Sequence, residues 1–470
     1  MSTQDQKGVG GWGLGAGVRA LVVGMKKSGM ASVELLVREG AEVRATDLKP
    51  LDELPQARDL LARLQVPFAQ QTPGVFDGSG PWPLASGRWA PALIVLSPDV
   101  PFDLPPLEAA RQRGALVIGE VELAAPFLKG QNIGITGSNG KTTTTSLVGH
   151  ILREAGLPVQ VGANIGTPVT AMIDSSRDDG WNVLELSSFQ LETICEFRAH
   201  IAVALNVTQN HLDRHHTFET YAAAKARLFE TQRGGDFAVL NADDPVCVSY
   251  AQRTAASPQW FSSRRKVSPG ASLCGDKLIL DGKLLMEAGE IPIRGRHNVE
   301  NVLAGSIAAA RAGVPRDAIA AAVRTFRAVE HRLEFVRRVS GIDFYNDSKA
   351  TSVDATLKAV DAFAGGLWVI LGGKDKGLDY TLLREPLAAK AHAAVLIGAA
   401  AVKIATALEG AVPLVDAKTL DAAIAHAYRN GGQGDTVLLA PACASFDQFR
   451  SYEHRGEVFK QIVNQLEAKE

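Results

Sequence analysis

The sequence predicts an α/β protein of three domains with mostly parallel sheets. Its 470 residues are more than a single hydrophobic core usually serves. Short apolar segments alternate with amphipathic helical segments, as they do in doubly wound folds. A loop of glycines, hydroxyls and one lysine stands between such a strand and such a helix. We expect domains over residues 18–126, 127–328 and 329–470, after a floppy glycine-rich leader over residues 1–17.

The first domain has the strand, glycine turn, helix, strand order of a Rossmann-like dinucleotide-binding unit. Asp47 follows the glycines by about 20 residues, as the acidic residue of such a unit does. The predicted elements are a strand over residues 20–23, a turn over 24–29, a helix over 30–38 and strands over 43–46, 93–96 and 116–118.

Two lysines occupy the glycine turn of this unit. Lys26 replaces the middle glycine of the usual fingerprint, and Lys27 follows it. At a helix N-terminus the two ammonium groups could hold a diphosphate by charge. The alternative is a solvated basic turn.

The central domain opens with the pattern of a phosphate-binding loop. A strand over residues 132–136 runs into Gly137-Ser-Asn-Gly-Lys-Thr-Thr143 and then into a helix. Gly137 and Gly140 let backbone N–H groups approach a polyphosphate, Lys141 adds charge, and Thr142 or Thr143 can reach Mg²⁺. The loop is a variant, because Ile135 stands where the common P-loop has its first glycine. The pattern predicts a nucleoside triphosphate site, with an ordinary glycine-rich turn as the alternative.

The remaining predicted strands support parallel sheets in the second and third domains. The central domain has strands over residues 183–186 and 201–205 and a hairpin at Asp281-Gly282. The last domain, also Rossmann-like, has strands over residues 367–371, 394–397 and 437–439.

Several polar residues follow these strands, where open α/β sheets place their sites. Glu185 lies between apolar residues, so it is either paired with a cation or an exposed strand-end acid. The loop from Asn206 to His216 contains His211 and Asp213, which could bind a metal or a substrate carboxylate. Lys225, on composition alone, would be a helix-surface lysine.

The last domain offers further candidates at what we expect to be an interdomain cleft. Arg332 can bind phosphate with its guanidinium fork, and Asp347 can fix a ribose or a base. The segment Gly372-Gly-Lys-Asp-Lys-Gly377 repeats the combination of a glycine turn and lysines after an apolar strand.

Overall composition excludes several classes of protein. The net charge of -2 argues against nucleic acid or an anionic membrane as the main partner. No apolar run is long enough to span a bilayer, and the four cysteines have neither metal-ligand nor disulfide-scaffold spacing. We therefore expect a cytoplasmic protein without membrane insertion.

An ordered set of motifs from Val18 to Leu466 resembles the Mur ligases. The motifs are Gly137-Ser-Asn-Gly-Lys-Thr142, Gly162-Ala-Asn-Ile-Gly166, Glu185-Leu-Ser-Ser-Phe-Gln190, Asn206 with His211, Glu330-His-Arg332, Asn346-Asp-Ser-Lys-Ala-Thr351 and Ala440-Pro-Ala-Cys-Ala-Ser-Phe-Asp-Gln448. The resemblance implies a monomeric, ATP- and Mg²⁺-dependent amide ligase of peptidoglycan precursor synthesis. Within the family it points to the branch that adds D-glutamate to UDP-N-acetylmuramoyl-L-alanine through an acyl phosphate.

The resemblance also implies roles for individual residues. The catalytic group comprises Lys141, His211, Lys225 and Lys349. ATP would be bound by Gly137, Ser138, Asn139, Gly140, Lys141, Thr142, Thr143, Asn298, Asn301, Arg332 and Asp347. The UDP-sugar would be bound by Lys26, Lys27, Ser28, Asp47, Asn164 and Gln190, and D-glutamate by Thr351, Lys376, Ser445 and Tyr452. The metal ligands would be Thr142, Glu185, His211 and Lys225, the last of these carbamylated.

The sequence departs from the family pattern mainly around the uridine pocket. Besides the two lysines in the turn, Leu48 follows Asp47, and Asp99 stands where a glycine is usual. Tyr452 and Ser352 replace an expected phenylalanine and asparagine. The differences around the uridine pocket predict that the nucleotide-sugar is bound differently, whereas neither Tyr452 nor Ser352 alters the charge of the site.

Three other functions compete with this interpretation. One is a ligase of the same superfamily that adds L-alanine, a diamino acid or folate-linked glutamate, although the Asp-Asn-Pro-Arg motif of the diamino acid branch is absent from the sequence. The others are a nicotinamide-dependent oxidoreductase, which leaves the phosphate loop unexplained, and a nucleotide-driven switch without amide synthesis.

Overall fold

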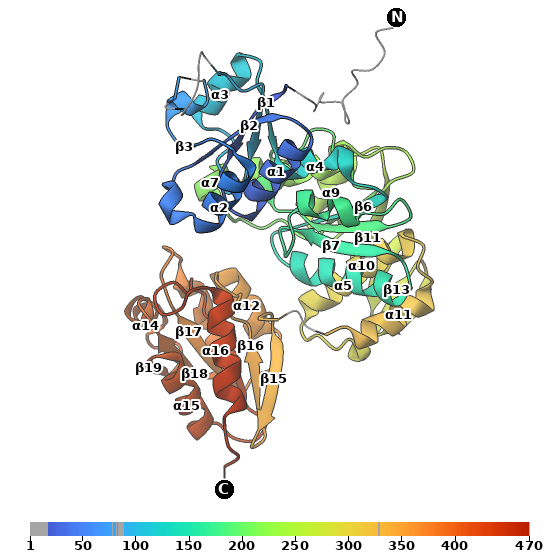
Figure 1. Ribbon diagram of the computed structural model, residues 1–470. Coiled ribbons are helices and arrows are strands. Elements are labelled where there is room, and N and C mark those ends of the chain that lie inside the picture. Colours follow the sequence, from blue (N-terminus) through green and yellow to red (C-terminus); the bar gives the residue numbers. More distant parts are fainter. Residues whose placement is uncertain (1–16, 78, 81, 83–88, 328–329, 470) are drawn as a thin grey trace, which may run out of the picture. The chain divides into compact units, whose positions relative to one another are not determined.

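The computed structural model describes residues 17–77, 79–80, 82, 89–327 and 330–469. In this part of the chain the strands form three sheets, one in each predicted domain, which confirms the three-domain α/β fold (Figure 1). The chain divides into two compact units. Unit 1 contains the described residues up to Met286 together with Val302–Ala322, and unit 2 contains Glu287–Asn301 and the described residues from Val323 onward. The leader predicted for residues 1–17 lies outside the described residues, apart from Gly17.

The first sheet is parallel, with the strand order β3-β2-β1-β4-β5. Alternate strand residues pack on opposite faces, Val22 toward α1 and Leu21 toward α3. The elements are β1 (Arg19–Val23), α1 (Lys27–Arg38), β2 (Glu42–Asp47), η1 (Leu51–Glu53), α2 (Pro55–Leu64), β3 (Phe68–Gln70), η2 (Pro73–Val75), β4 (Leu93–Leu96), α3 (Pro105–Gln112), β5 (Leu116–Gly119), α4 (Glu120–Ala124) and η3 (Ala125–Phe127).

The second sheet has the order β14-β13-β12-β11-β10-β9-β6-β8-β7 and is parallel from β12 to β7. Its strands and 3₁₀ segments are β6 (Gln131–Thr136), β7 (Val159–Ala163), η4 (Val169–Ser175), β8 (Trp181–Glu185), β9 (Ile201–Ala204), β10 (Phe237–Asn241), η5 (Tyr250–Arg253), β11 (Ser257–Ser262), β12 (Gly270–Cys274), β13 (Lys277–Leu280), β14 (Lys283–Glu287) and η6 (Ala288–Glu290). The helices are α5 (Lys141–Glu154), α6 (Ser188–Leu191), α7 (Leu212–His215), α8 (Phe218–Glu230), α9 (Pro245–Ser249), α10 (Arg296–Arg311) and α11 (Arg316–Thr325). One continuous apolar core includes residues of both the first and the second sheet.

The third sheet has the order β15-β16-β20-β17-β18-β19, with only β15 antiparallel among its described pairings. Two cores lie on its opposite faces, one with α12 and α14 and the other with α15 and α16 (Figure 1). The elements are β15 (Glu334–Val339), β16 (Ile342–Asn346), α12 (Val353–Asp361), β17 (Leu367–Gly372), η7 (Tyr380–Leu383), α13 (Arg384–Lys390), β18 (Ala391–Ile397), α14 (Ala401–Leu408), β19 (Leu414–Lys418), α15 (Leu420–Asn430), β20 (Thr436–Leu439) and α16 (Tyr452–Asn464).

Several predicted boundaries are corrected by the structure. Helix α1 begins at Lys27 rather than at Met30, because Lys26 is extended and serves as its N-cap. Strand β8 ends at Glu185 and β9 at Ala204, each one residue earlier than predicted. No helix among the described residues is long and apolar enough to cross a membrane.

Candidate functional site

The phosphate loop connects β6 to α5 in the geometry that its glycines predict. Gly140 is the N-cap of α5 with φ 83°, a left-handed conformation that favours glycine. A Cβ at Gly137 would lie 3.0 Å from the Cβ of Leu205, so the neighbouring strand end leaves little room for a side chain. The first N–H groups of α5, a 14-residue helix, therefore face the loop at the positive end of the helix dipole.

The segment that follows β9 holds this loop in place. The backbone N–H of Asn139 donates to Oδ1 of Asn206 at 2.9 Å, and the N–H of Ser138 donates to the carbonyl of Asn206 at 2.8 Å. The hydroxyl of Ser138 lies 3.0 Å from the carbonyl oxygen of Thr208 and 2.9 Å from the hydroxyl of Tyr221. Because β6 and β9 are adjacent at the switch in strand order, these bonds fix the loop where α/β sheets bind ligands.

Two lysines approach the same carbonyl group of the loop. Nζ of Lys141 donates to the carbonyls of Gly137 and Ser138 at 2.9 and 3.1 Å. Nζ of Lys225 donates to the carbonyl of Gly137 at 2.9 Å and lies 3.5 Å from Oγ1 of Thr136. The two Nζ atoms share one carbonyl oxygen, which places Lys225 of α8 directly beside the phosphate loop.

Lys225 is buried, which contradicts the surface position expected from composition. Its side chain is 1% exposed and its Nζ lies 4.7 Å from the ring centroid of Tyr221. Burial, together with the nearby charge of Lys141, lowers the pKa of Lys225 well below its usual value. The neutral amine of Lys225 is therefore favoured.

Glu185 is also buried, so the exposed strand-end alternative is wrong. The residue is 2% exposed and lies opposite Ile135 in the pairing of β8 with β6, beside the start of the phosphate loop. Its Oε1 accepts a hydrogen bond from Nδ2 of Asn164 at 2.6 Å. Its Oε2 is buried and has no hydrogen-bond partner among the described residues. A buried carboxylate oxygen without a donor is costly unless a cation neutralises it.

The residues around the phosphate loop fit Mg²⁺, although no cluster of His, Cys, Asp and Glu side chains surrounds them in the described part of the chain. No group of three or more His, Cys, Asp or Glu residues in the described chain could hold an ion. Mg²⁺ binds through one or two carboxylates together with water and substrate phosphates, so it needs no such group. Thr142 and Thr143, at the start of α5, are buried hydroxyls beside the phosphate loop.

The histidines after β9 divide into different environments. His211 is exposed at the N-cap of α7, with its ring centroid 5.0 Å from that of Phe189. His215 is buried, with Nε2 2.9 Å from Oγ of Ser188 and Nδ1 3.0 Å from Oε1 of Glu192. The His215 ring is therefore a structural contact, and His211 remains the candidate ligand. The side chain of Asp213 lies outside the described residues.

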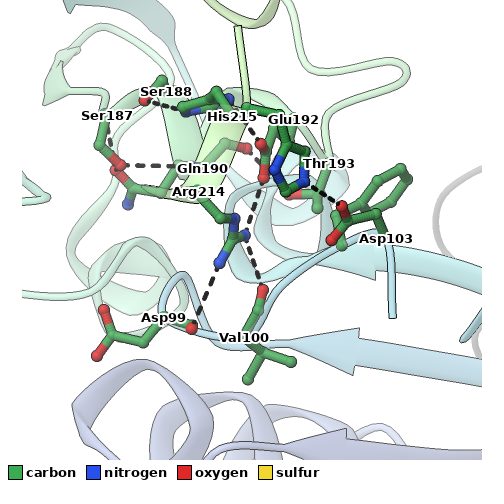
Figure 2. A network of polar contacts seen from close by, with 12 residues as sticks. Asp99, Val100, Asp103, Ser187, Ser188, Gln190, Glu192, Thr193, Arg214 and His215 are labelled. Atoms are coloured by element: carbon green, nitrogen blue, oxygen red, sulfur yellow. Dashed lines mark hydrogen bonds and ion pairs between the residues drawn. The ribbon is translucent and has the colours of Figure 1, made fainter. Parts of the chain in front are cut away.

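Arg214, on the same short helix, joins the first and second sheets (Figure 2). Its Nη2 donates to the carbonyl of Val100 at 2.8 Å and to Oε2 of Glu192 at 2.9 Å. Its Nη1 lies 3.4 Å from the carbonyl oxygen of Asp99, and its guanidinium lies 4.8 Å from the ring centroid of Phe189. The turn after β4 is thereby tied to the segment that carries His211.

The residues predicted to bind the UDP-sugar in the first domain follow β1, at the switch point between β1 and β4, and end the neighbouring strand β2. Oδ2 of Asp47 accepts from the N–H of Met25 at 2.6 Å, which closes the turn after β1. Lys27 is exposed in the first turn of α1, which also contains Ser28. The ammonium of Lys26 pairs with Oδ2 of Asp99 at 2.5 Å, and both side chains are exposed. The altered positions of the glycine turn and of the turn after β4 thus contact each other.

Gln190 is hydrogen-bonded within its own segment, where it helps to cap helix α6. Its Oε1 accepts from the N–H of Ser187 at 3.0 Å, and its own N–H donates to Oγ of Ser187 at 3.3 Å. This capping box starts α6 just after Glu185.

In unit 2, three of the four residues predicted for D-glutamate lie on loops at the carboxyl ends of adjacent strands. Nζ of Lys376, after β17, donates to the carbonyl of Thr351, after β16, at 3.2 Å. Ser445 follows β20 and is 2% exposed. The N–H of Ala442 donates to the carbonyl of Ala350 at 2.9 Å, which joins the loops after β20 and β16. The structure therefore brings together the loops that carry Thr351, Lys376 and Ser445.

Tyr452 and Lys349 also meet in unit 2. Nζ of Lys349 lies 5.3 Å from the ring centroid of Tyr452, the first residue of α16. A cation over an aromatic face is attracted by the ring quadrupole.

The residues predicted for the nucleoside in unit 2 are largely buried. Asp347 is 9% exposed, and burial raises its pKa to about 7, with Arg332 acting in the opposite direction. Asn298 and Asn301 are joined by a hydrogen bond of 2.9 Å in the first turns of α10.

Arg455 is a buried residue at this site that the sequence analysis missed. It is fully buried, and its guanidinium donates to Oγ and the carbonyl of Ser348 at 3.0 and 2.8 Å and to the carbonyl of Cys443. It ties α16 to the loops after β16 and β20. Its spacing in the sequence could have indicated this burial, because Arg455 lies on the same face of α16 as the buried residues Phe459 and Val463.

Two family descriptions match the chain: the Mur ligase middle domain over residues 135–309, and the Mur ligase, glutamate ligase domain over residues 331–443. A UDP-N-acetylmuramoylalanine--D-glutamate ligase from Solibacter usitatus (strain Ellin6076) is 76% identical over 454 residues, covering 97% of this chain and 99% of that protein. A protein of the same name from Acidobacterium capsulatum is 51% identical, with 95% and 96% covered.

Solved structures share the fold at low identity. A pseudomurein peptide ligase type C from Methanothermus fervidus matches with a TM-score of 0.58 and 18% identity, covering 95% of this chain and 99% of that chain. The UDP-N-acetylmuramate-alanine ligase MurC from Thermotoga maritima matches with a TM-score of 0.58, 17% identity and the same two coverages.

Proposed function

The chain belongs to the Mur ligase family, and we propose that it joins D-glutamate to UDP-N-acetylmuramoyl-L-alanine with the consumption of ATP. The observation that carries this function is the phosphate loop with Lys141, which has the buried Lys225 and the partnerless oxygen of Glu185 beside it. Such a site is built to hold and neutralise a polyphosphate.

The reaction needs ATP because a carboxylate is a poor electrophile at neutral pH. The γ-phosphoryl group is transferred to the L-alanyl carboxylate, which forms an acyl phosphate and ADP. The amine of D-glutamate then attacks the carbonyl carbon, a C–N bond forms, a proton is lost and phosphate leaves. Lys141 and its loop hold the β- and γ-phosphates, so positioning and charge neutralisation provide most of the catalysis.

The residues around the loop fit Mg²⁺, whose chemistry here is to neutralise phosphate charge. Thr142 and Glu185 would hold one Mg²⁺ ion, and His211 and Lys225 would lie near a second. An ammonium cannot ligate a metal ion, whereas addition of CO₂ to the neutral Lys225 amine gives a carbamate with oxygen ligands and releases a proton. The support for carbamylation is the burial of Lys225, which favours its neutral form.

We assign the UDP-sugar to the first domain, residues 18–126. Lys26, Lys27 and Ser28 stand at the switch point of its sheet and Asp47 ends the adjacent strand β2, which supports a nucleotide there. Asn164 and Gln190 would contact the sugar or the L-alanyl part. The pair between Lys26 and Asp99 means that a diphosphate competes with Asp99 for the ammonium.

We assign ATP to the domain of residues 127–328 and D-glutamate to that of residues 329–470, where Thr351, Lys376, Ser445 and Tyr452 would bind its two carboxylates. Lys349 joins the catalytic group. Asn298, Asn301, Arg332 and Asp347 would bind the nucleoside part of ATP. We further propose that the enzyme acts as a monomer and that it acts in the cytoplasm. The cytoplasmic location agrees with the four free cysteines in the described chain.

Phosphate release from ATP and UDP-N-acetylmuramoyl-L-alanine across a panel of amino acids tests the function. D-glutamate should be ligated, and D-aspartate should fail because a displaced carboxylate leaves buried polar groups unsatisfied. L-glutamate should fail because its amine points away while both carboxylates are held. Preference for L-alanine or a diamino acid would assign another Mur reaction, and ATP hydrolysis indifferent to any amino acid would indicate a switch protein.

A further inference from the structure

Beyond the residues assigned above, we propose that Tyr380 is a positioning residue that sets the affinity for D-glutamate. Its hydroxyl joins the lysine loop, Gly372–Gly377, to the serine loop, Ala440–Ser445. These loops carry Lys376 and Ser445. The inference rests on the proposed function, because it takes D-glutamate as the ligand of Lys376.

The hydroxyl of Tyr380 has one partner in each loop. The residue is 1% exposed in η7, and its hydroxyl donates to Oδ1 of Asp375 at 2.8 Å and lies 3.0 Å from Sγ of Cys443. Burial raises the pKa of Tyr380, so the phenol stays protonated and remains a donor to Asp375. Burial also raises the pKa of Cys443, so its thiol can donate to the phenol oxygen.

Asp375 passes this contact on to Lys376. Its Oδ1, which accepts from Tyr380, also accepts from the N–H of Gly377 at 3.0 Å. Lys376 therefore lies between two residues, Asp375 and Gly377, that are hydrogen-bonded to each other. The ammonium of Lys403 pairs with Oδ2 at 2.7 Å and lowers the pKa of Asp375 to about 2, which keeps the carboxylate charged. The Tyr380 hydroxyl thus helps to fix the carboxylate of Asp375, to which the backbone of the lysine loop is also hydrogen-bonded.

The backbones of the two loops are joined independently of Tyr380. Lys374 and Ala444 exchange N–H to carbonyl bonds of 2.8 and 3.2 Å, and the N–H of Gly372 donates to the carbonyl of Pro441 at 2.9 Å. Loss of the hydroxyl therefore leaves the loops connected but frees Asp375 to shift. Because Lys376 lies next to Asp375, the effect should fall on the amino acid and spare the nucleotide substrates.

Tyr380→Phe removes only the hydroxyl, and Tyr428→Phe is its matched control. The hydroxyl of Tyr428 is hydrogen-bonded in the same unit, to Ser340 at 2.9 Å and to the carbonyl of Glu467 at 2.6 Å, but Ser340 precedes β16 at the other end of the sheet. Steady-state kinetics of the full chain should show KM for D-glutamate raised about tenfold in Tyr380→Phe, the equivalent of one hydrogen bond to a charged group. We expect little change in kcat, in KM for ATP and for UDP-N-acetylmuramoyl-L-alanine, and in every constant of Tyr428→Phe.

Variants of Cys443 test the second arm of the contact. Cys443→Ser keeps a donor for the phenol and should retain the wild-type KM for D-glutamate, whereas Cys443→Ala should raise it. This pair decides the matter if Tyr380→Phe does not fold.

An unchanged KM for D-glutamate in Tyr380→Phe, or an equal rise in KM for ATP, would overturn the inference and leave Tyr380 a general structural residue. Failure of the wild type to ligate D-glutamate would instead remove the proposed function, so the two results are distinguishable.

Discussion

The environment of single residues decides the chemistry of this site, and Lys225 is the clearest case. We predict that Lys225→Ala is inactive and that a short carboxylic acid such as acetate partly restores turnover by replacing the lost carbamate oxygens. The reason is that a buried neutral amine beside the phosphate loop can take up CO₂. Phosphate release with and without acetate measures the effect. Full activity of the variant in bicarbonate-free buffer would contradict carbamylation.

Residues also show how far sequence alone can reach. The phosphate loop was predictable because its glycines and Lys141 are local in the chain. The burial of Lys225 was not, because it depends on packing of α8 against a loop that lies 88 positions away along the chain. Arg455 was missed for the same reason, since its partners Ser348 and Cys443 come from loops after two different strands.

Among the elements, α4 is a junction between the first and second sheets, held by two buried carboxylates. Oε1 of Glu120 accepts from the N–H and the hydroxyl of Thr170 at 2.6 and 2.8 Å. Glu122, two residues later, accepts from the N–H groups of Cys195, Glu196 and Phe197 at 2.7–3.0 Å through both of its oxygens. We therefore expect replacement by glutamine to affect the stability of the protein differently at these two positions.

Burial raises the pKa of Glu120 from 4.5 to about 7. Between these values the folded protein binds more protons than the unfolded chain, so this group lowers stability as pH rises through the window. Glu120→Gln removes the titration and keeps an acceptor for Thr170. We predict that the difference in unfolding temperature, variant minus wild type, is larger at pH 8 than at pH 5.

Glu122→Gln is the matched control at the same junction. Its amide cannot accept on both atoms, so the variant should lose about 1–3 kcal/mol at both pH values. Thermal unfolding of the two variants at pH 5 and pH 8 makes the comparison. If the unfolding temperatures of Glu120→Gln and of the wild type changed equally between pH 5 and pH 8, the pKa of Glu120 would not be raised in the folded protein.

The predicted strands agree with the structure where they are apolar and central. The segments at residues 93–96, 367–371 and 437–439 fall within β4, β17 and β20, because strands buried on both faces read as continuous apolar runs. Among the strands that were missed, β7 and β15 are half-buried and carry polar residues that break this signal, whereas β10 is central and largely buried. The edge strands β5 and β14 were nonetheless predicted, so an edge position alone does not hide a strand from sequence analysis.

Over the whole molecule, the two units carry different parts of the proposed reaction. The phosphate loop, Glu185 and Lys225 belong to unit 1, whereas Thr351, Lys376 and Ser445 belong to unit 2. Formation of the acyl phosphate involves no D-glutamate, so it should not depend on the residues that bind this amino acid. The two half-reactions should therefore separate by mutation.

We predict that Lys376→Ala still forms the acyl phosphate from ATP and UDP-N-acetylmuramoyl-L-alanine but ligates D-glutamate poorly. Lys141→Ala should lose both steps, because a charge-assisted contact to the transferred phosphoryl group is worth on the order of 1.5–3 kcal/mol or more in a dry site. Borohydride reduces an acyl phosphate to an alcohol, so the alcohol formed without D-glutamate measures the first step, and product formation measures both. Unfolding temperatures near that of the wild type would show that each variant is folded. Equal loss of the trapped alcohol in both variants would mean that Lys376 acts in phosphoryl transfer, and the D-glutamate pocket would then have to be sought elsewhere in unit 2.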